Sequence, residues 1–324
     1  AVFEVLPEVE LVSLAGVDIK RPVAEIDDAD VDDMVQRLLK QRQTWEDVER
    51  AAEDGDQVQI SFKGTIDGEA FDGGEANDVP LVLGAGMMIE GFDAGLVGAS
   101  AGEKRTLELR FPDDYRVEKL AGKPVAFEVE VAKVAQPVVP ELNEELAKSF
   151  GVESGDIEQF KADIRNNMNR ELNQRIQSKV KDQAMGALLD AHAIEVPGAL
   201  VEEEIDNLRK QARQGAPVGS NMELPRDLFE PQAKRRVALG LIIAEVVKSN
   251  KIMVDQKRVA GAIEDLAGSY EDPQQVVEFY KNDRNQRASV ENLVLEEQVV
   301  DWILEQAQVE EVQSSFKEIT EGAE

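Results

Sequence analysis

The stretch 84–109 reads GAGMMIEGFDAGLVGASAGEKRTLEL and contains six glycines in its first nineteen positions. Such a density of glycine is typical of backbone that lies close to another group, and a phosphate is the commonest such group. The residues between these glycines are apolar, however, and include Met87, Met88 and Phe92. Gly91 and Gly95 lie four positions apart, at helical spacing. The stretch therefore predicts a short helix whose glycines allow close packing on a sheet.

Runs of alternating apolar and polar residues on both sides of this stretch predict the strands of that sheet. One apolar side chain in two is expected to face a core, which is typical of half-buried antiparallel strands. The apolar members are Val58, Ile60 and Phe62 in the first run, Leu107, Leu109 and Phe111 in the second, and Val125, Phe127, Val129 and Val131 in the third. Residues 41–136 therefore form one glycine-rich sheet domain in this interpretation.

The flanking regions are predicted to differ from the sheet domain. Residues 1–40 begin with strand-like alternation and continue into EIDDADVDDMVQRLLKQRQ, whose acidic start and apolar stripe favour a helix. Beyond the proline-bearing linker QPVVPEL, residues 137–324 show helical periodicity, including one helix predicted to reach about 50 Å. The predicted fold class is α+β, with a small antiparallel sheet domain wrapped on a short helix and attached to a larger all-helical domain.

Composition restricts the function. The net charge is −30 and the isoelectric point about 4.4, so we expect no direct binding of nucleic acid or of an anionic membrane. The chain has no cysteine, and no apolar run reaches the roughly 18 residues of a membrane-spanning helix. A soluble, cytoplasmic protein is therefore predicted. The first residue is Ala1 rather than methionine, and we expect the chain to begin inside a longer natural protein.

Motifs for metal, nucleotide or covalent chemistry are not found. A dinucleotide-binding G-x-G-x-x-G would need glycine at position 89, which is isoleucine, and GEKRT is not a Walker loop. The acidic run DDADVDD lacks the glycine and final glutamate of a calcium loop, and a helix start explains it. The single histidine, His192, is interpreted as a helix-end residue without a special role. No cofactor and no metal are predicted.

One reaction suits an apolar pocket without acid, base or metal, namely rotation about an X–Pro peptide bond. Its barrier is about 18–20 kcal/mol because resonance gives the C–N bond partial double-bond character. Transfer of the prolyl carbonyl from water into an apolar site removes solvation that favours the planar, charge-separated form. Backbone donors and shape then favour the twisted state.

The motif F-x-G-x-x-x-G-x-x-F-D at 62–72, the motif L-G-x-G-x-x-I-x-G-F at 83–92 and the closing F-E-V-E-V at 127–131 occur in this order. With them the domain resembles the FKBP-type peptidyl-prolyl isomerases. The resemblance implies that Phe92 forms the pocket floor, that the Ile89 N–H donates to the substrate carbonyl, and that Asp72 forms a polar wall. The full implied set is Phe62, Phe71, Asp72, Met88, Ile89, Phe92, Tyr115 and Phe127. Where many family members have tryptophan and tyrosine, this chain has Phe92 and Phe62, which makes the pocket more apolar.

The flanking segments VVPELNEELAKSFGVESGDIEQF, VPGALVEEEIDNLRKQA and YEDPQQVVEFY extend the resemblance to the bacterial trigger factor family over nearly the whole chain. It implies a C-terminal helical body with long arms that holds unfolded or nascent, proline-containing polypeptides. It also implies a ribosome partner in the full-length protein, but not through this chain, because the N-terminal ribosome-docking domain with its basic loop is missing. The alternative is a partner-specific prolyl isomerase whose helices serve only as a docking or oligomerisation scaffold.

Overall fold

The computed structural model describes residues 7–215, 224–268, 270 and 272–322. The chain separates into two compact units. The first comprises residues 27–166, and the second comprises residues 1–26 together with 167–324.

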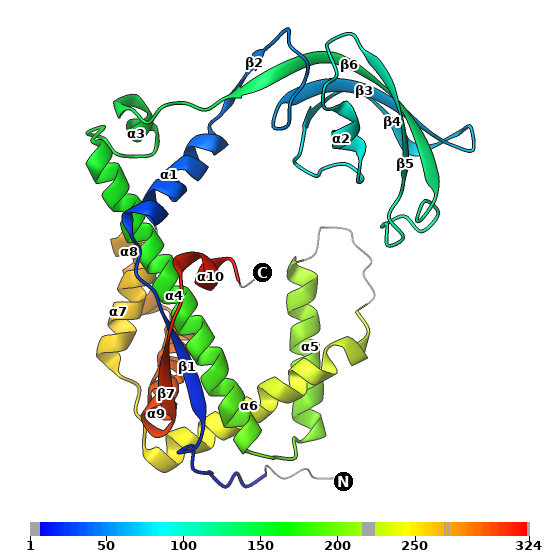
Figure 1. The fold of residues 1–324 in the computed structure, drawn as a ribbon. Helices are drawn as coiled ribbons and strands as arrows, with labels where there is room; N and C mark the ends of the chain where they lie inside the picture. Colours follow the sequence, from blue (N-terminus) through cyan, green and yellow to red (C-terminus); the bar gives the residue numbers. More distant parts are fainter. Residues whose placement is uncertain (1–6, 216–223, 269, 271, 323–324) are drawn as a thin grey trace. The chain divides into compact units, whose positions relative to one another are not determined.

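The unit 27–166 contains a five-stranded antiparallel sheet that curves around the short helix α2, Phe92–Leu96 (Figure 1). β6 pairs with β2, with β3 and with β5, and β4 continues the sheet beyond β3. The strand bounds are Thr44–Asp47 for β2, Gln57–Ile66 for β3, Glu69–Val82 for β4, Lys104–Arg110 for β5 and Pro124–Val138 for β6. The three predicted strands correspond to β3, β5 and β6. No sequence pattern predicted β2 or β4.

The predicted glycine-notched helix is confirmed as α2. Gly91 precedes the helix with φ +87°, a conformation that other residues adopt only with strain. A Cβ at Gly95 would lie 2.6 Å from Cδ2 of Leu107 on β5, so a side chain there would push the helix off the sheet. Phe92 and Leu96 are fully buried against the sheet. These glycines serve turns and close packing, and no phosphate is needed to explain them.

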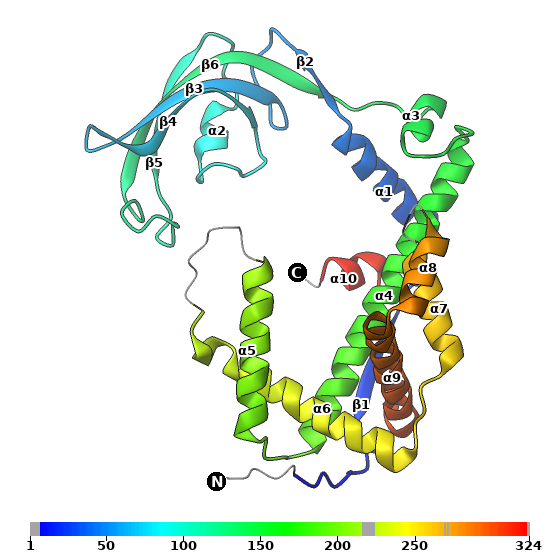
Figure 2. The ribbon, with the colours of Figure 1, turned by 180° about the vertical axis from the view of Figure 1, so that it is seen from behind.

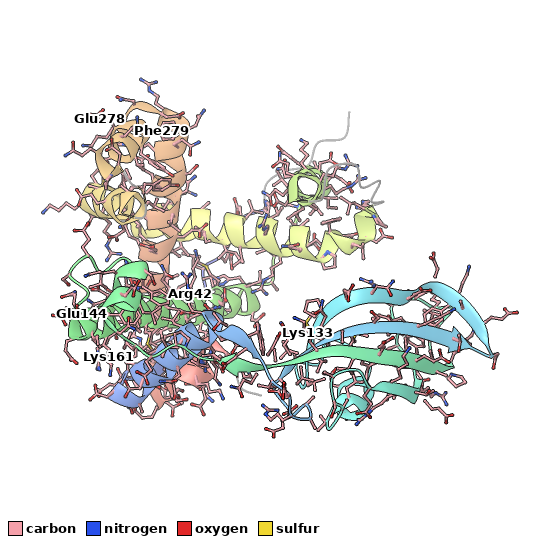
Figure 3. The ribbon with its side chains drawn as sticks, turned by 90° about the horizontal axis from the view of Figure 1, so that it is seen from above. Arg42, Lys133, Glu144, Lys161, Glu278 and Phe279 are labelled. Atoms are coloured by element: carbon pink, nitrogen blue, oxygen red, sulfur yellow. The ribbon has the colours of Figure 1, made fainter. Side chains whose placement is uncertain are left out.

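The same unit contains α1, Asp28–Gln41, with α3, Glu144–Ser149, and the first turns of α4, Ile157–Ala191. The acidic run begins α1, as predicted: the Asp27 carboxylate accepts from the Asp30 N–H, and the Asp30 carboxylate accepts from the Asp27 N–H. Lys161 of α4 pairs with Asp32 of α1 at 2.7 Å, and the Arg42 guanidinium lies 5.2 Å from the centre of the Phe150 ring (Figure 3 labels Lys161 and Arg42).

The second unit is mainly helical (Figure 2). Its largest core cluster takes buried side chains from α4, α6 and α9, and a smaller one joins α7 to α9. Among the described residues, no helix combines the length and the apolar character that crossing a membrane requires. The remaining helices are α5, Gly198–Gly215, a 3-10 turn at Arg226–Leu228, α6, Glu230–Asn250, α7, Gln256–Ala267, α8, Pro273–Asn282, α9, Arg284–Gln306, and α10, Phe316–Thr320.

A two-stranded parallel sheet joins the two ends of the described chain. β1, Asp18–Val23, pairs with β7, Gln308–Gln313, and places Lys20 beside Glu310. The Gln183 side chain of α4 bonds to both the N–H and the C=O of Lys20, at 2.9 and 2.8 Å. Residues 1–40 contain a strand followed by a helix, but the strand lies at β1 and not in the alternating residues 7–11, which are irregular; residues 1–6 lie outside the described part.

His192 has a structural role that the sequence analysis did not predict. It follows α4, is buried, and uses both ring nitrogens. Nδ1 lies 2.7 Å from the Leu188 carbonyl oxygen, and Nε2 accepts a hydrogen bond of 2.9 Å from the Val12 N–H. Because Nε2 accepts, the bound ring is neutral and carries its proton on Nδ1. The histidine thereby fixes the segment before β1 to the end of the long helix.

Candidate functional site

A cavity of about 420 Å³ opens in the unit 27–166 beside the sheet and the loop before α2. Six of the eight predicted site residues line it, and they come from five separate segments of the chain. These six are Phe62, Phe71, Met88, Ile89, Tyr115 and Phe127.

Aromatic rings packed edge to face form the wall of the cavity. The Phe127 ring lies 5.8 Å from Phe62 and 6.4 Å from Phe71, with interplanar angles near perpendicular. Phe111 continues the series, 5.8 Å from Phe71 and 4.7 Å from Tyr115. Such pairs stabilise by about 0.5–1.5 kcal/mol each beyond the area they bury, so the rings hold one another in place.

Gly64 on β3 makes room for these rings. A Cβ at this position would lie 2.6 Å from Cε1 of Phe127 and 2.9 Å from Cε1 of Phe71. Distances below about 3 Å are sterically excluded, so a larger residue would displace the wall. The glycine of the motif F-x-G is therefore explained by ring packing.

The loop 84–91 forms the other side of the cavity and is held by hydrogen bonds from its backbone. Asp93 Oδ2 accepts from the N–H groups of Gly84 and Gly86, each at 3.2 Å, and both glycines have positive φ. This arrangement presents Met88 and Ile89 to the cavity. Among the described residues the Ile89 N–H has no acceptor, which leaves it available to a bound molecule.

Asp56 fixes the backbone at Leu83, the residue that precedes this loop. Its backbone C=O accepts from the Leu83 N–H at 2.9 Å, and its buried carboxylate is bound by Arg50 and by the Glu53 N–H. Burial disfavours the charged form, but the hydrogen bonds from Arg50 and Glu53 outweigh it, so the pKa of Asp56 lies below its usual range.

Two predicted site residues lie elsewhere. Phe92 is fully buried and does not line the cavity: it lies beneath the wall, with its ring 5.9 Å from Phe62 and 5.4 Å from Phe127. It supports the floor rather than forming its surface. Asp72 is exposed and is not among the lining residues, although the next residue, Gly73, is. The structure gives no support to Asp72 as a polar wall.

The structure adds lining residues that the sequence analysis missed, namely Gly73, Met87, Glu90, Phe111 and Pro112. Met87 is 79% exposed at the edge of the cavity. Phe111 follows β5 directly and is the last apolar residue of the alternating run, but its place beside the cavity depends on how the chain turns at Pro112. Glu90 stands between two motif positions, where no pattern specified its side chain.

The second unit has a separate groove of about 650 Å³ beside the start of α7 and the C-terminal half of α9. Met253, 83% exposed, and Trp302 supply its apolar surface, and Arg258 pairs with Asp301 at 2.6 Å. The other lining residues are Ile252, Gln298, Leu304 and Glu305. An exposed, flexible methionine next to an aromatic ring suits a surface that adapts to several partners.

The first cavity has the composition of a binding site for a small apolar group. Its lining contains no cysteine, serine, histidine or lysine. In the described part of the chain no three acidic or imidazole side chains are grouped as a metal would require. The arrangement can hold an apolar ring against phenylalanine and methionine, with one backbone N–H free to donate to a carbonyl.

Comparison with known families assigns nearly all of the chain. Residues 48–132 match the model of the FKBP-type peptidyl-prolyl cis-trans isomerases. Residues 156–305 match the C-terminal model of the bacterial trigger factor protein. Residues 1–38, most of the segment 1–40 that was predicted to contain a strand and a helix, match the bacterial trigger factor model that covers the N-terminal part. A trigger factor of Stutzerimonas stutzeri (strain A1501) is 50% identical over 327 residues, covering all of this chain and 74% of that protein.

Solved structures give weaker similarity. A structure of the trigger factor chaperone, described by its promiscuous substrate recognition, is 21% identical with a TM-score of 0.45, covering 93% of this chain and 73% of that one. A structure of trigger factor domains from Thermotoga maritima is 19% identical with a TM-score of 0.32, covering 42% of this chain and 86% of that one.

Proposed function

The chain belongs to the bacterial trigger factor family, and on that premise we propose that the cavity lined by Phe62, Met88 and Phe127 is the site at which it isomerises prolyl bonds. As a family member it is a folding chaperone with an FKBP-type peptidyl-prolyl cis-trans isomerase domain and a C-terminal chaperone domain. We take the isomerase domain to be residues 41–136, between an N-terminal segment, 1–40, and the helical region, 137–324.

In the proposed mechanism the proline ring of a client enters the aromatic cavity and the carbonyl before it leaves water. Loss of solvation weakens the charge-separated resonance form that keeps the bond planar. The free Ile89 N–H donates to the carbonyl oxygen and is placed by the loop that Asp93 holds. The rings of Phe62 and Phe127 fit the twisted proline better than either planar isomer, so the barrier falls without a covalent step.

The observation that carries this proposal is a small cavity of phenylalanine and methionine with a free backbone donor at its edge. Methyl-labelled methionine offers a direct test by NMR. Addition of a short proline peptide is expected to shift the Met87 and Met88 methyl signals. Those of the buried Met168 and Met185, and of the exposed Met253 in the other unit, should not move.

The matched control is the same peptide with alanine in place of proline, which should shift the Met87 and Met88 signals much less. A proline peptide that leaves both signals unchanged while it is being isomerised would show that the reaction occurs elsewhere. Shifts confined to Met253 would assign peptide binding to the helical groove instead.

We further propose that the groove of Met253 and Trp302 contributes to holding unfolded clients. The scaffold alternative is not favoured, because residues 156–305 match the trigger factor C-terminus. In a Trp45→Phe variant, Trp302 is the sole tryptophan, and an unfolded client is expected to change its fluorescence. Met253→Ser should weaken that binding, whereas Val117→Ser, an exposed apolar change in the isomerase unit, should not. Equal weakening by both variants would contradict the assignment.

The finer statements about partners also belong to this proposal. We propose that the clients are unfolded or nascent polypeptides that contain proline, that the protein acts in the cytoplasm, and that contact with the ribosome is not made through the segment present in this chain. Co-sedimentation of this chain with ribosomes at physiological salt tests the last point, and stoichiometric binding would refute it.

A further inference from the structure

β7 in the second unit has one edge that is hydrogen-bonded and one that is open. The N–H groups of Gln308 and of Ser314, just past the strand, donate to β1. Because successive backbone groups of a strand point to opposite sides, the N–H and C=O groups of Val309, Glu311 and Gln313 point away from β1. In the described part of the chain no hydrogen bond reaches these outward groups. The outer edge of β7 therefore offers three residues with unpaired backbone groups.

The opposite edge of the same small sheet is covered. β1 turns the N–H and C=O of Lys20 toward α4, where the Gln183 side chain bonds to both, at 2.9 and 2.8 Å (Figure 1). The glutamine amide thus occupies the place that a residue of a further strand would take. β7 has no such cover among the described residues, and an uncovered edge is a template for pairing with another extended chain.

The side chains of β7 indicate which kind of chain can pair there. Glu310 and Glu311 are exposed, lie on opposite faces of the strand, and stand in register with Lys20 and Arg21 of β1. Side chains directly opposite each other in neighbouring strands stabilise the pair when their charges differ and destabilise it when they are alike. A second copy of β7, paired antiparallel about its centre, would place glutamate opposite glutamate. The edge therefore favours a segment with lysine or arginine over a second copy of this chain.

We propose that the outer edge of β7 is a strand-addition site for extended segments of unfolded clients that carry lysine or arginine. Hydrogen bonds to the backbone supply affinity that depends little on sequence, and the two glutamates set the preference for basic segments. This site is separate from the isomerase cavity and from the groove of Met253 and Trp302, and it depends on neither.

The test adds a proline-free peptide of alternating valine and lysine to the full chain and follows amide hydrogen exchange by NMR. At about ten times the Kd, exchange at Val309, Glu311 and Gln313 is expected to slow about ten-fold. The amides of Gln308 and Glu310 already bond to β1 and should change much less. A peptide that does not bind, or that binds and leaves the three outward amides unprotected, overturns the inference. Protection that rises with protein concentration in the absence of peptide assigns the edge to a second copy and overturns it as well.

Two variants separate backbone pairing from charge. Glu311→Pro removes an outward N–H but no hydrogen bond to β1, and it should weaken peptide binding about ten-fold. Glu311→Gln, the matched control, keeps the N–H and should weaken binding of the lysine peptide only about two- to five-fold. Unchanged exchange at Gln308 shows that β1 and β7 remain paired in each variant. Equal binding by both variants contradicts pairing through the backbone.

A modified peptide tests the same point without any change to the protein. The valine–lysine peptide with methyl groups on the nitrogens of consecutive central residues cannot pair through either of its edges. It should bind the unmodified chain about ten-fold more weakly than the parent peptide. Equal affinity of the two peptides overturns the inference, and shifts of the Met253 methyl signal by both would assign their binding to the helical groove.

Discussion

Replacement of Phe62 by alanine tests the isomerase site most directly, because its ring forms part of the cavity wall and is only half-buried. A fully buried Phe→Ala change costs about 3–5 kcal/mol, and partial burial reduces this to about 2 kcal/mol. The edge-to-face contacts with Phe92 and Phe127 are included in that cost. Domains have a free energy of unfolding of about 5–15 kcal/mol, so the variant should remain folded.

The catalytic effect should be larger than this loss of stability suggests. The ring offers the proline an apolar surface worth about 1.5–3 kcal/mol, and each 1.36 kcal/mol of lost transition-state stabilisation lowers the rate about ten-fold. We therefore expect kcat/KM for a proline tetrapeptide to fall about 10- to 100-fold. The assay should avoid a coupled protease, since a destabilised variant is digested more readily. Exchange NMR or a fluorescence-quenched peptide at low temperature meets this condition.

Phe279→Ala serves as the control, because Phe279 on α8 is 52% exposed in the other unit (Figure 3). The Phe279→Ala variant should have the same kcat/KM for the proline tetrapeptide as the unmodified chain. Phe92→Ala is not a suitable test, because Phe92 is fully buried and its loss would destabilise the domain. Normal turnover in a folded Phe62→Ala variant would refute the assignment of the cavity.

Three further changes probe the framework around the sites. Gly95→Ala should lower the free energy of unfolding by about 1–3 kcal/mol in urea titration, because the new methyl group would lie 2.6 Å from Cδ2 of Leu107; an unchanged midpoint would contradict the close packing. Asp56→Asn should cost about 2 kcal/mol at neutral pH through loss of charge-assisted hydrogen bonds. Because the pKa of Asp56 is lowered in the folded protein, its carboxylate contributes to the free energy of unfolding above its ordinary pKa, and this contribution is lost as the pH falls below about 4. The difference in stability between Asp56→Asn and the unmodified protein should therefore shrink in acid. A difference that stays constant with pH would contradict this role of the carboxylate. His192→Leu should cost about 1–3 kcal/mol and speed hydrogen exchange at the Val12 amide, which loses its acceptor; unchanged exchange there would show that the imidazole does not anchor this segment.

The periodicity of apolar residues within one segment predicted the strands and helices that show such a pattern. The alternation at Val58 to Phe62 gave β3, and the apolar steps after Ile157 gave the long helix. β4 was missed because its segment, Glu69–Val82, contains four consecutive polar or glycine residues at 72–75 and has bulges in its pairing with β3. β1 and β7 were missed as a pair because their partners are nearly 300 residues apart in sequence. Parallel pairing over such a distance has no local signal.

The sequence by itself determined which residues could carry chemistry here. The apolar residues between the glycines predicted an apolar pocket suited to bond rotation, and the order of the motifs predicted six residues that line one cavity. Only the tertiary structure decided that Phe92 supports the wall from beneath and that Asp72 faces solvent. It likewise decided that Glu90 lies at the cavity and that His192 binds a segment 180 residues away. The physical reason is that residue type fixes what a side chain can do, whereas its burial and partners depend on segments that meet only when the chain folds.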